Sequence, residues 1–146
     1  MQYTSELHLT IFRFKIKCYE LLFFKVIKSD FEAAISKVTE ELKKEGFGVL
    51  TNIDMKETLK KKLDVDIRKY KILGACNPQF AHQALLAESQ IGTMLPCNVV
   101  VQERENGEVE ISAVDPVASM MAIVNPGLVE LAQQVSVKLK SVVENV

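Results

Sequence analysis

The sequence predicts an α+β fold in which strands and helices share one core. Three observations support this class: segments rich in aromatic and β-branched residues recur along the chain, helix-capping signals stand between them, and Asn106-Gly107 predicts a tight antiparallel hairpin. A chain of 146 residues has the usual size of a single domain. Because no repeat or linker divides it, we expect one α+β domain over residues 21–146.

Residues 1–20 form an extra N-terminal segment in this interpretation. Apolar residues occupy the even positions from 12 to 18, as in a half-solvated strand, but the odd positions from 7 to 11. This change of phase indicates a bulge, two short pieces, or a tail outside the fold. The core is therefore expected to begin with a strand at residues 21–27, which are rich in aromatic and β-branched side chains.

A helix is predicted after this strand, because Ser29 and Glu32 have capping-box spacing. Gly46 is expected to end it, since glycine adopts the left-handed conformation common just after a helix. A strand at 47–53 follows. The apolar stripe of the helix consists of Phe31, Ala34, Ile35, Val38 and Leu42.

The middle of the chain predicts two more helices around a strand at 70–76. Asp54 caps the first, a short helix whose Met55, Leu59 and Leu63 are expected to face inward and whose other face is rich in lysine. Asn77-Pro78 supplies a cap and a proline at the first helical position, so the second helix is expected to run to about Ser89.

The C-terminal third predicts a hairpin and two helices. Strands at 95–104 and 108–114 flank a two-residue loop with both residues at positive φ, which would place Glu103 opposite Glu110. Asp115-Pro116 and Asn125-Pro126 each supply a cap and a proline at the first helical position. The first pair predicts the start of a short apolar helix, and the second the start of a long helix. The buried stripe of the long helix is predicted to be Leu128, Leu131, Ala132, Val135, Leu139, Val142 and Val143.

Composition restricts the partners and the compartment. The net charge of -1 and pI of about 6.1 create no global positive field, so nucleic acid is not an expected partner. Three widely spaced cysteines fit a reducing compartment better than a disulfide framework. Charged residues interrupt every apolar run before it reaches membrane-spanning length, and the secretory signal pattern is missing. We therefore expect a cytoplasmic protein without a membrane partner.

Seven segments carry a family resemblance: GFGVL at 46–50, IDMK at 53–56, YKILGACNP at 70–78, AH at 81–82, IG at 91–92, LPCNV at 95–99 and AVDP at 113–116. From about Leu21 to the C-terminus, the chain resembles the bacterial and archaeal family called domain of unknown function 302. The resemblance implies helices packed on one face of a curved, mostly antiparallel sheet, similar to the TATA-binding-protein type. It implies no established reaction.

The candidate site depends on how two strands are paired. If the strand that ends at Cys76 and the strand that starts near Cys97 are antiparallel neighbours, as the implied sheet favours, both thiols lie at one edge. A parallel crossover would separate them by about 17–20 Å. In the first arrangement the edge also gathers Asn77, Asn98 and the positive start of the helix at Pro78. A small polar or anionic ligand is then expected there.

Two further residues on the helix after Pro78 are candidates. His82 lies at the border of the apolar face and is either a packed or surface histidine, or an acid, base or ligand. Glu88 lies within the apolar arc, so it needs a cationic partner, unless the helix end frays and frees it to solvent. The thiol of Cys76 could be a reactive thiolate or a soft metal ligand, but Cys76, Cys97 and His82 are too few for a tetrahedral zinc site, so no set of metal ligands is assigned.

Three hypotheses of function follow. The leading one is a homodimeric module that binds a small ligand or a metal at this sheet edge, with Cys76, Asn77, His82, Glu88, Cys97 and Asn98 as its site residues. The dimer is suggested by the apolar segment 120–124, which suits a two-fold interface. The alternatives are an enzyme with Cys76 or Cys97 as its nucleophile and His82 as its base, and an assembly protein without a ligand. No cofactor is indicated, and whether a reaction is catalysed stays open.

Overall fold

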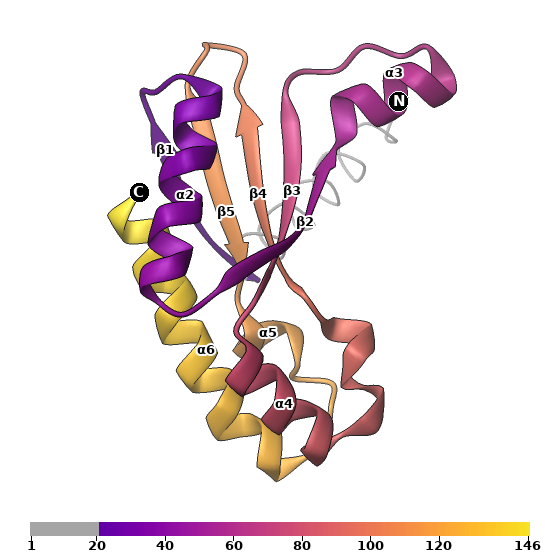
Figure 1. The fold of residues 1–146 in the computed structure, drawn as a ribbon, viewed down its shortest axis with the longest axis vertical. Helices are drawn as coiled ribbons and strands as arrows, with labels where there is room; N and C mark the ends of the chain where they lie inside the picture. Colours follow the sequence, from indigo (N-terminus) through magenta and orange to yellow (C-terminus); the bar gives the residue numbers. More distant parts are fainter. Residues whose placement is uncertain (1–20) are drawn as a thin grey trace, which may run out of the picture.

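The computed structural model describes residues 21–146, and the predictions for residues 1–20 lie outside this range. Predicted strands and helices are all found in it, with small shifts at their ends. The elements, labelled as in Figure 1, are β1 (Leu22–Ile27), α2 (Phe31–Lys44), β2 (Gly48–Asp54), α3 (Met55–Leu63), β3 (Tyr70–Cys76), α4 (Pro78–Ala87), the 3₁₀ helix η1 (Ser89–Met94), β4 (Cys97–Glu103), β5 (Val109–Val114), α5 (Pro116–Ser119) and α6 (Pro126–Asn145).

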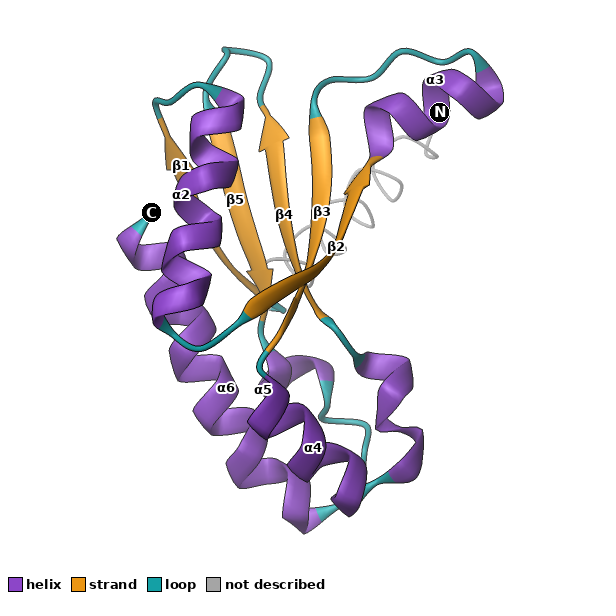
Figure 2. Cartoon of the chain, in the orientation of Figure 1, coloured by secondary structure: helices purple, strands orange, loops and turns teal. Residues whose placement is uncertain are grey.

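The strands form one five-stranded sheet in the order β1-β5-β4-β3-β2, and every neighbouring pair is antiparallel. Helices α2 and α6 pack against one face of this open, twisted sheet (Figures 1 and 2). Helix α4, η1 and α5 gather beyond one end of it, which we call the lower end because it lies lowest in Figure 1. The predicted α+β class, with helices on an antiparallel sheet, is confirmed.

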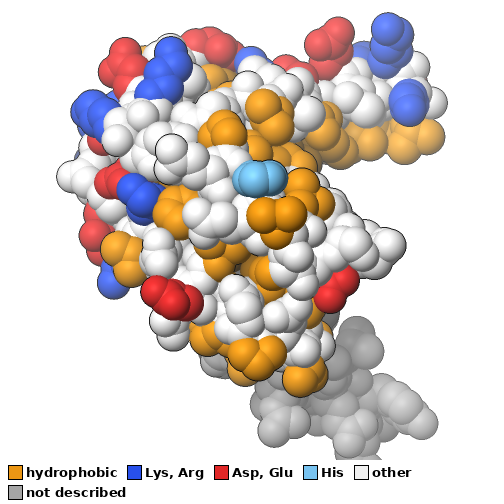
Figure 3. All heavy atoms as spheres, turned by 60° about the horizontal axis from the view of Figure 1, so that its bottom comes forward, with side chains coloured by type: hydrophobic (Ala, Val, Ile, Leu, Met, Phe, Trp, Pro, Cys, Tyr) orange, Lys and Arg blue, Asp and Glu red, His pale blue; other side chains and the backbone are white. Residues whose placement is uncertain are grey.

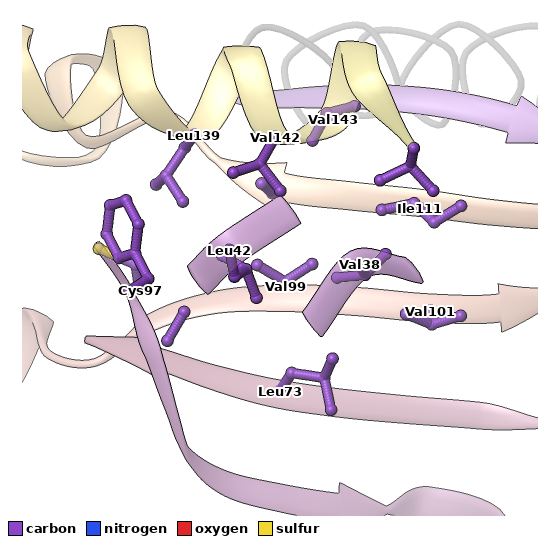
Figure 4. Close-up of a cluster of buried hydrophobic side chains, with 14 of the residues drawn as sticks. Val38, Leu42, Leu73, Cys97, Val99, Val101, Ile111, Leu139, Val142 and Val143 are labelled. Carbon is purple, nitrogen blue, oxygen red and sulfur yellow. The ribbon is translucent and has the colours of Figure 1, made fainter. Parts of the chain in front are cut away.

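The main core lies between the sheet and the two long helices. Alternate residues of a strand point to opposite faces, so Val99 and Val101 of β4 and Ile111 of β5 face the helices together. They meet Leu42 of α2 and Leu139 of α6, and all five side chains are fully buried (Figure 4). A smaller core of Ala84, Ile91 and Leu128 holds the lower end together.

Helix α2 begins one residue later than the capping-box spacing predicted. Asp30, not Ser29, is the cap, and its carboxylate accepts hydrogen bonds from the backbone N–H groups of Glu32 and Ala33. Both residue types are good caps, which explains the shift. The C-terminal prediction is confirmed: Gly46 has a φ of 85°, and the Phe47 N–H donates to the Leu42 carbonyl oxygen at 2.9 Å.

The hairpin register differs from the prediction by one residue. Gln102 lies opposite Glu110, and Glu103 lies opposite Val109. The loop is longer than two residues, because the Arg104 N–H bonds to the Glu108 carbonyl oxygen and only Gly107, with a φ of 81°, has positive φ there. This is the three-residue type of hairpin loop, whose extra residue removes the predicted opposition of two glutamates.

Helix α3 is the largest departure from the sequence-based prediction. It projects beyond the sheet (Figure 1), and none of its residues is fully buried. Met55 and Leu59 are half-buried and Leu63 is exposed, so the expected inward packing is found only in part. A hydrogen bond from Lys56 Nζ to the Ile67 carbonyl oxygen, at 2.9 Å, ties this helix to the loop that follows it. Local periodicity predicted the helix correctly but could not show that its apolar side would be covered only in part.

None of the helices described over residues 21–146 is both long enough and apolar enough to span a lipid bilayer.

Candidate functional site

The structure places Cys76 and Cys97 at the same end of the sheet. Strand β3 pairs with β4 in antiparallel register, with Ala75 opposite Cys97, so the antiparallel alternative holds. Both thiols are free, Cys97 buried and Cys76 half-buried. The end of one strand and the beginning of the next therefore deliver two sulfur atoms to the lower end.

The two cysteines line a small cavity between the sheet end, α4 and α6. Its volume is about 40 Å³, and its wall is almost entirely apolar. Helix α4 contributes Phe80, Ala81 and Ala84 to this wall, and α6 contributes apolar residues between 128 and 135. The remaining lining residues are Phe47, Ala75, Asn77, Leu95, Pro116, Met120, Leu128, Leu131, Ala132 and Val135.

A second, more open pocket of about 240 Å³ adjoins this cavity. Four residues line both spaces: Leu95, Cys97, Pro116 and Met120. The outer pocket has a mixed polar and apolar wall, to which Asn98 and Ser119 contribute polar groups. The cavity and the outer pocket thus form one candidate site with an apolar inner part and a more polar mouth.

Burial controls the chemistry of Cys97. Burial first, and then the neighbouring Cys76, raise the pKa of the Cys97 thiol from 9.0 to about 11. A thiol with this pKa stays protonated at neutral pH, whereas the thiolate is the nucleophile and the soft metal ligand. Cys97 is therefore suited to packing a ligand and not to attacking one.

The two asparagines have different roles. Asn77 caps α4: its Oδ1 accepts from the Phe80 N–H and its Nδ2 donates to the Glu45 carbonyl oxygen, each at 3.5 Å. Both of its polar groups thus serve the fold. Asn98 is exposed, and strand alternation turns it away from the face that carries Cys97. It reaches the outer pocket but not the cavity.

His82 and Glu88 lie outside both spaces. His82 is exposed on α4, on the side away from the buried Ala84. Glu88 ends α4, and its Oε1 accepts a hydrogen bond from the Gln90 N–H at 3.2 Å, so it caps η1. Helix α4 ends at Ala87, before the predicted Ser89, and this earlier end turns Glu88 out of the apolar arc.

Within residues 21–146, no group of three histidine, cysteine or acidic side chains could hold a metal ion. Of the six predicted site residues, the structure brings together Cys76, Asn77 and Cys97 at the cavity, with Asn98 at its mouth. The apolar walls from 116–120 and 128–135 were not predicted as part of the site. The wall from 128–135 belongs to the predicted buried stripe of the long helix, and the wall from 116–120 adjoins an apolar segment with more hydrophobic positions than one helix stripe needs.

Comparisons with known proteins agree with the resemblance found in the sequence. A family model described as "Domain of unknown function DUF302" matches residues 24–146. The chain is also similar to a solved crystal structure of an uncharacterized conserved DUF302 protein from Bacillus stearothermophilus, with 30% identity and a TM-score of 0.79 over 86% of this chain and 97% of that one. A comparison with curated proteins finds no match. The chain therefore belongs to the DUF302 family.

Proposed function

We propose that the protein is a binding module for a small, largely apolar molecule at the lower end of the sheet. The observation that carries this proposal is the wall of four residues shared by the apolar cavity and the outer pocket. A ligand would place an apolar group against Cys97 and Met120 and leave a polar group in the mouth near Asn98. Apolar walls with a few polar groups at one side are typical of small-molecule sites.

The size of the cavity indicates how a ligand would enter. A volume of 40 Å³ exceeds what one water needs, but it is too small for a drug-sized molecule. Met120 lines both the cavity and the outer pocket, and methionine has three flexible bonds that let it fill or vacate irregular space. Movement of this side chain would join the two spaces without a change in the backbone.

The test uses indole as a small apolar probe. We expect titration of ¹⁵N-labelled protein to shift the amide signals of Cys97 and Met120, with saturation near a Kd of about 1 mM, the range of weak fragments. An Ala132→Val variant adds two carbons to the cavity wall and should weaken the binding of indole about tenfold or more. Ala33→Val, at an exposed position of α2, is the matched control and should leave binding unchanged.

Two results would contradict the ligand proposal. One is the lack of any saturable shift with indole. The other is a set of shifts confined to exposed residues such as Val124, with no response at Cys97. Native mass spectrometry of the purified protein provides an independent readout, because a retained small molecule adds a defined mass.

An enzyme that uses a reactive cysteine has less support. The raised pKa of Cys97 opposes thiolate formation, and His82 is not among the residues lining either space. A general base must come within hydrogen-bond reach of the proton that it removes. The ligand-binding proposal needs neither a thiolate at Cys97 nor a general base beside it.

We also propose that the lower end forms a homodimer interface. Among its exposed apolar side chains, Leu86 is 76% exposed, Met121 80% and Val124 98%. A hydrogen bond from Asn125 Nδ2 to the Ala87 carbonyl oxygen, at 2.9 Å, brings the segments of Leu86 and Val124 together. Figure 3 shows this end with its hydrophobic groups and few charges.

A second copy fits this surface better than a charged partner does. At the lower end, residues 89–98 and 116–129 carry no charged side chain, and interface cores are depleted of charge. Two copies of such a surface can face each other across a two-fold axis without repulsion. Exposed apolar patches, when they are contiguous and large, mark protein–protein interaction sites.

Sedimentation equilibrium tests the dimer. We expect the wild type to be dimeric and Val124→Glu to weaken the dimer about tenfold or more, because it places one charge from each copy in an apolar interface. Val137→Glu is the matched control: this valine of α6 is also 70% exposed but lies in the helix beyond the charge-free segment. A monomeric wild type, or equal effects of the two variants, would contradict the proposal.

A further inference from the structure

Two arginines face each other at the upper end of the sheet, where β3 begins and β4 ends. The pairing of Tyr70 with Gln102 continues past the strand ends, because the Glu103 N–H donates to the Lys69 carbonyl oxygen at 2.9 Å. One more step of this antiparallel register places Arg68 opposite Arg104. The alternation of side chains puts both arginines on the face that carries Tyr70.

This face is turned away from the core. Leu73 and Val101 point toward α2 and α6, so Tyr70 and Gln102, which alternate with such positions, point the other way. A concave pocket of about 540 Å³ lies here. Its lining residues are Ile67, Arg68, Tyr70, Arg104 and Glu105.

The protein satisfies these two guanidinium groups only in part. Arg68 donates one hydrogen bond, from its terminal nitrogen to Gln102 Oε1 at 2.9 Å. Arg104 Nε lies 3.8 Å from Glu110 Oε2, a carboxylate that also accepts from Gln102 Nε2 at 2.9 Å. Because each guanidinium has five N–H donors, most donors of this pair have no acceptor among the described residues.

Facing cations of this kind are normally unfavourable. Like charges directly opposite each other in a sheet destabilise it. Within residues 21–146, Glu110 is the one carboxylate in the hydrogen-bonded network around the two arginines, so a single negative charge faces two positive charges. A bound anion between Arg68 and Arg104 would remove the repulsion and use the spare donors. Guanidinium groups bind carboxylates and phosphates through two parallel hydrogen bonds, which makes arginine well suited to this task.

We propose that Arg68, Arg104 and Tyr70 form a binding site for a small organic oxyanion, a phosphate or carboxylate carried on a planar body. The oxyanion lies between the guanidinium groups, and the planar part lies against the Tyr70 ring. Glu105 on the pocket wall lowers the local positive charge, so a single oxyanion is favoured over a polyanion such as nucleic acid.

The site is distinct from the cysteine-lined cavity. Tyr70 begins β3 and Cys76 ends it, so the two sites lie at opposite ends of the same strand. The oxyanion site therefore does not depend on the proposed function, and each can fail without the other.

Isothermal titration calorimetry of the full chain tests the site with phenyl phosphate and benzoate. We expect saturable binding of at least one probe, and the tighter probe identifies the preferred oxyanion. The double variant Arg68→Gln/Arg104→Gln should weaken it about tenfold or more, since hydrogen bonds to charged groups are among the strongest in proteins. Lys61→Gln removes an exposed positive charge from α3 and should leave binding unchanged.

Further measurements separate recognition from general charge effects. Arg104→Lys keeps the charge but loses the planar fork, so its affinity should fall between those of the wild type and the double variant. Circular dichroism establishes that the double variant is folded, and the tighter probe should raise the Tm of the wild type but not of that variant. Failure of both probes to bind the wild type, or equal affinities for the wild type and the double variant, would overturn the proposal.

Discussion

The hydroxyl of Ser141 donates a hydrogen bond to Glu45 Oε1 over 2.8 Å, and this contact joins the end of α2 to α6. Lys138 Nζ, one turn earlier on α6, lies 3.2 Å from the other carboxylate oxygen. The hydrogen bond from Ser141 first, and then Lys138, hold the pKa of the Glu45 carboxyl below its usual 4.5. The two helices that cover the sheet are thus connected by a carboxylate that must be ionised.

This contact predicts a pH-dependent loss of stability in a Glu45→Gln variant. Because the folded-state pKa is lowered, the stabilisation is fully present above the unfolded value near 4.5 and is lost as the pH falls through the folded value. At pH 7 the variant should lose about 1 kcal/mol of unfolding free energy in urea titrations. The difference from the wild type should shrink as the pH falls below 4.5. Glu144→Gln, at an exposed position, is the control, and a loss independent of pH would contradict this account.

Gly74 occupies a position where no larger residue fits. An added Cβ would overlap Thr51 Oγ1 of the neighbouring strand and come within 2.7 Å of the Pro96 ring. We expect Gly74→Ala to lower the unfolding free energy by about 1–3 kcal/mol, the usual cost of overpacking. Gly92→Ala places the same methyl group in open space and should stay within about 0.5 kcal/mol of the wild type. Urea denaturation measures both variants. If Gly74→Ala and Gly92→Ala change the unfolding free energy equally, the prediction is contradicted, because Thr51 and Pro96 would then make room for the methyl group without loss of stability.

Much of the fold could be predicted because its signals are local. Runs of β-branched and aromatic residues located the strands, and Asn77-Pro78 located the start of α4. Where two local signals were equally good, the sequence could not decide between them. Ser29 and Asp30 are both good caps for α2, and Asn106-Gly107 suits hairpin loops of two or three residues. The hairpin register therefore depended on the whole sheet.

The candidate site could be predicted only in part, for a related reason. The meeting of Cys76 and Cys97 follows from one antiparallel pairing, which the sequence allowed as an alternative. The exposure of His82 depends on how α4 rotates to bury Ala84, and the role of Met120 depends on helices that pack together from distant parts of the chain. Neither relation leaves a pattern in the nearby sequence.

The buried thiol of Cys97 should react slowly with alkylating reagents. Raising the pKa from 9.0 to about 11 lowers the thiolate fraction about a hundredfold at neutral pH, and only 8% of the residue is exposed. Iodoacetamide labelling followed by peptide mass spectrometry should show Cys97 modified far more slowly in the native protein than in urea. The native rate should continue to rise with pH up to about 11. Equal rates in native and denatured protein would contradict the assigned burial.

The exposed apolar side of α3 predicts an unusual contrast between two leucines. Leu63 is 66% exposed at the end of this helix, whereas Leu42 is fully buried in α2. Leu63→Ala should change the unfolding free energy by less than about 0.5 kcal/mol, because few contacts are lost and alanine favours a helix. Leu42→Ala should cost about 2–5 kcal/mol, since it leaves a cavity in a packed core. Urea titrations of both variants at several protein concentrations test this contrast. A loss above about 1 kcal/mol for Leu63→Ala would contradict it and would mean that the apolar side of α3 is covered in solution.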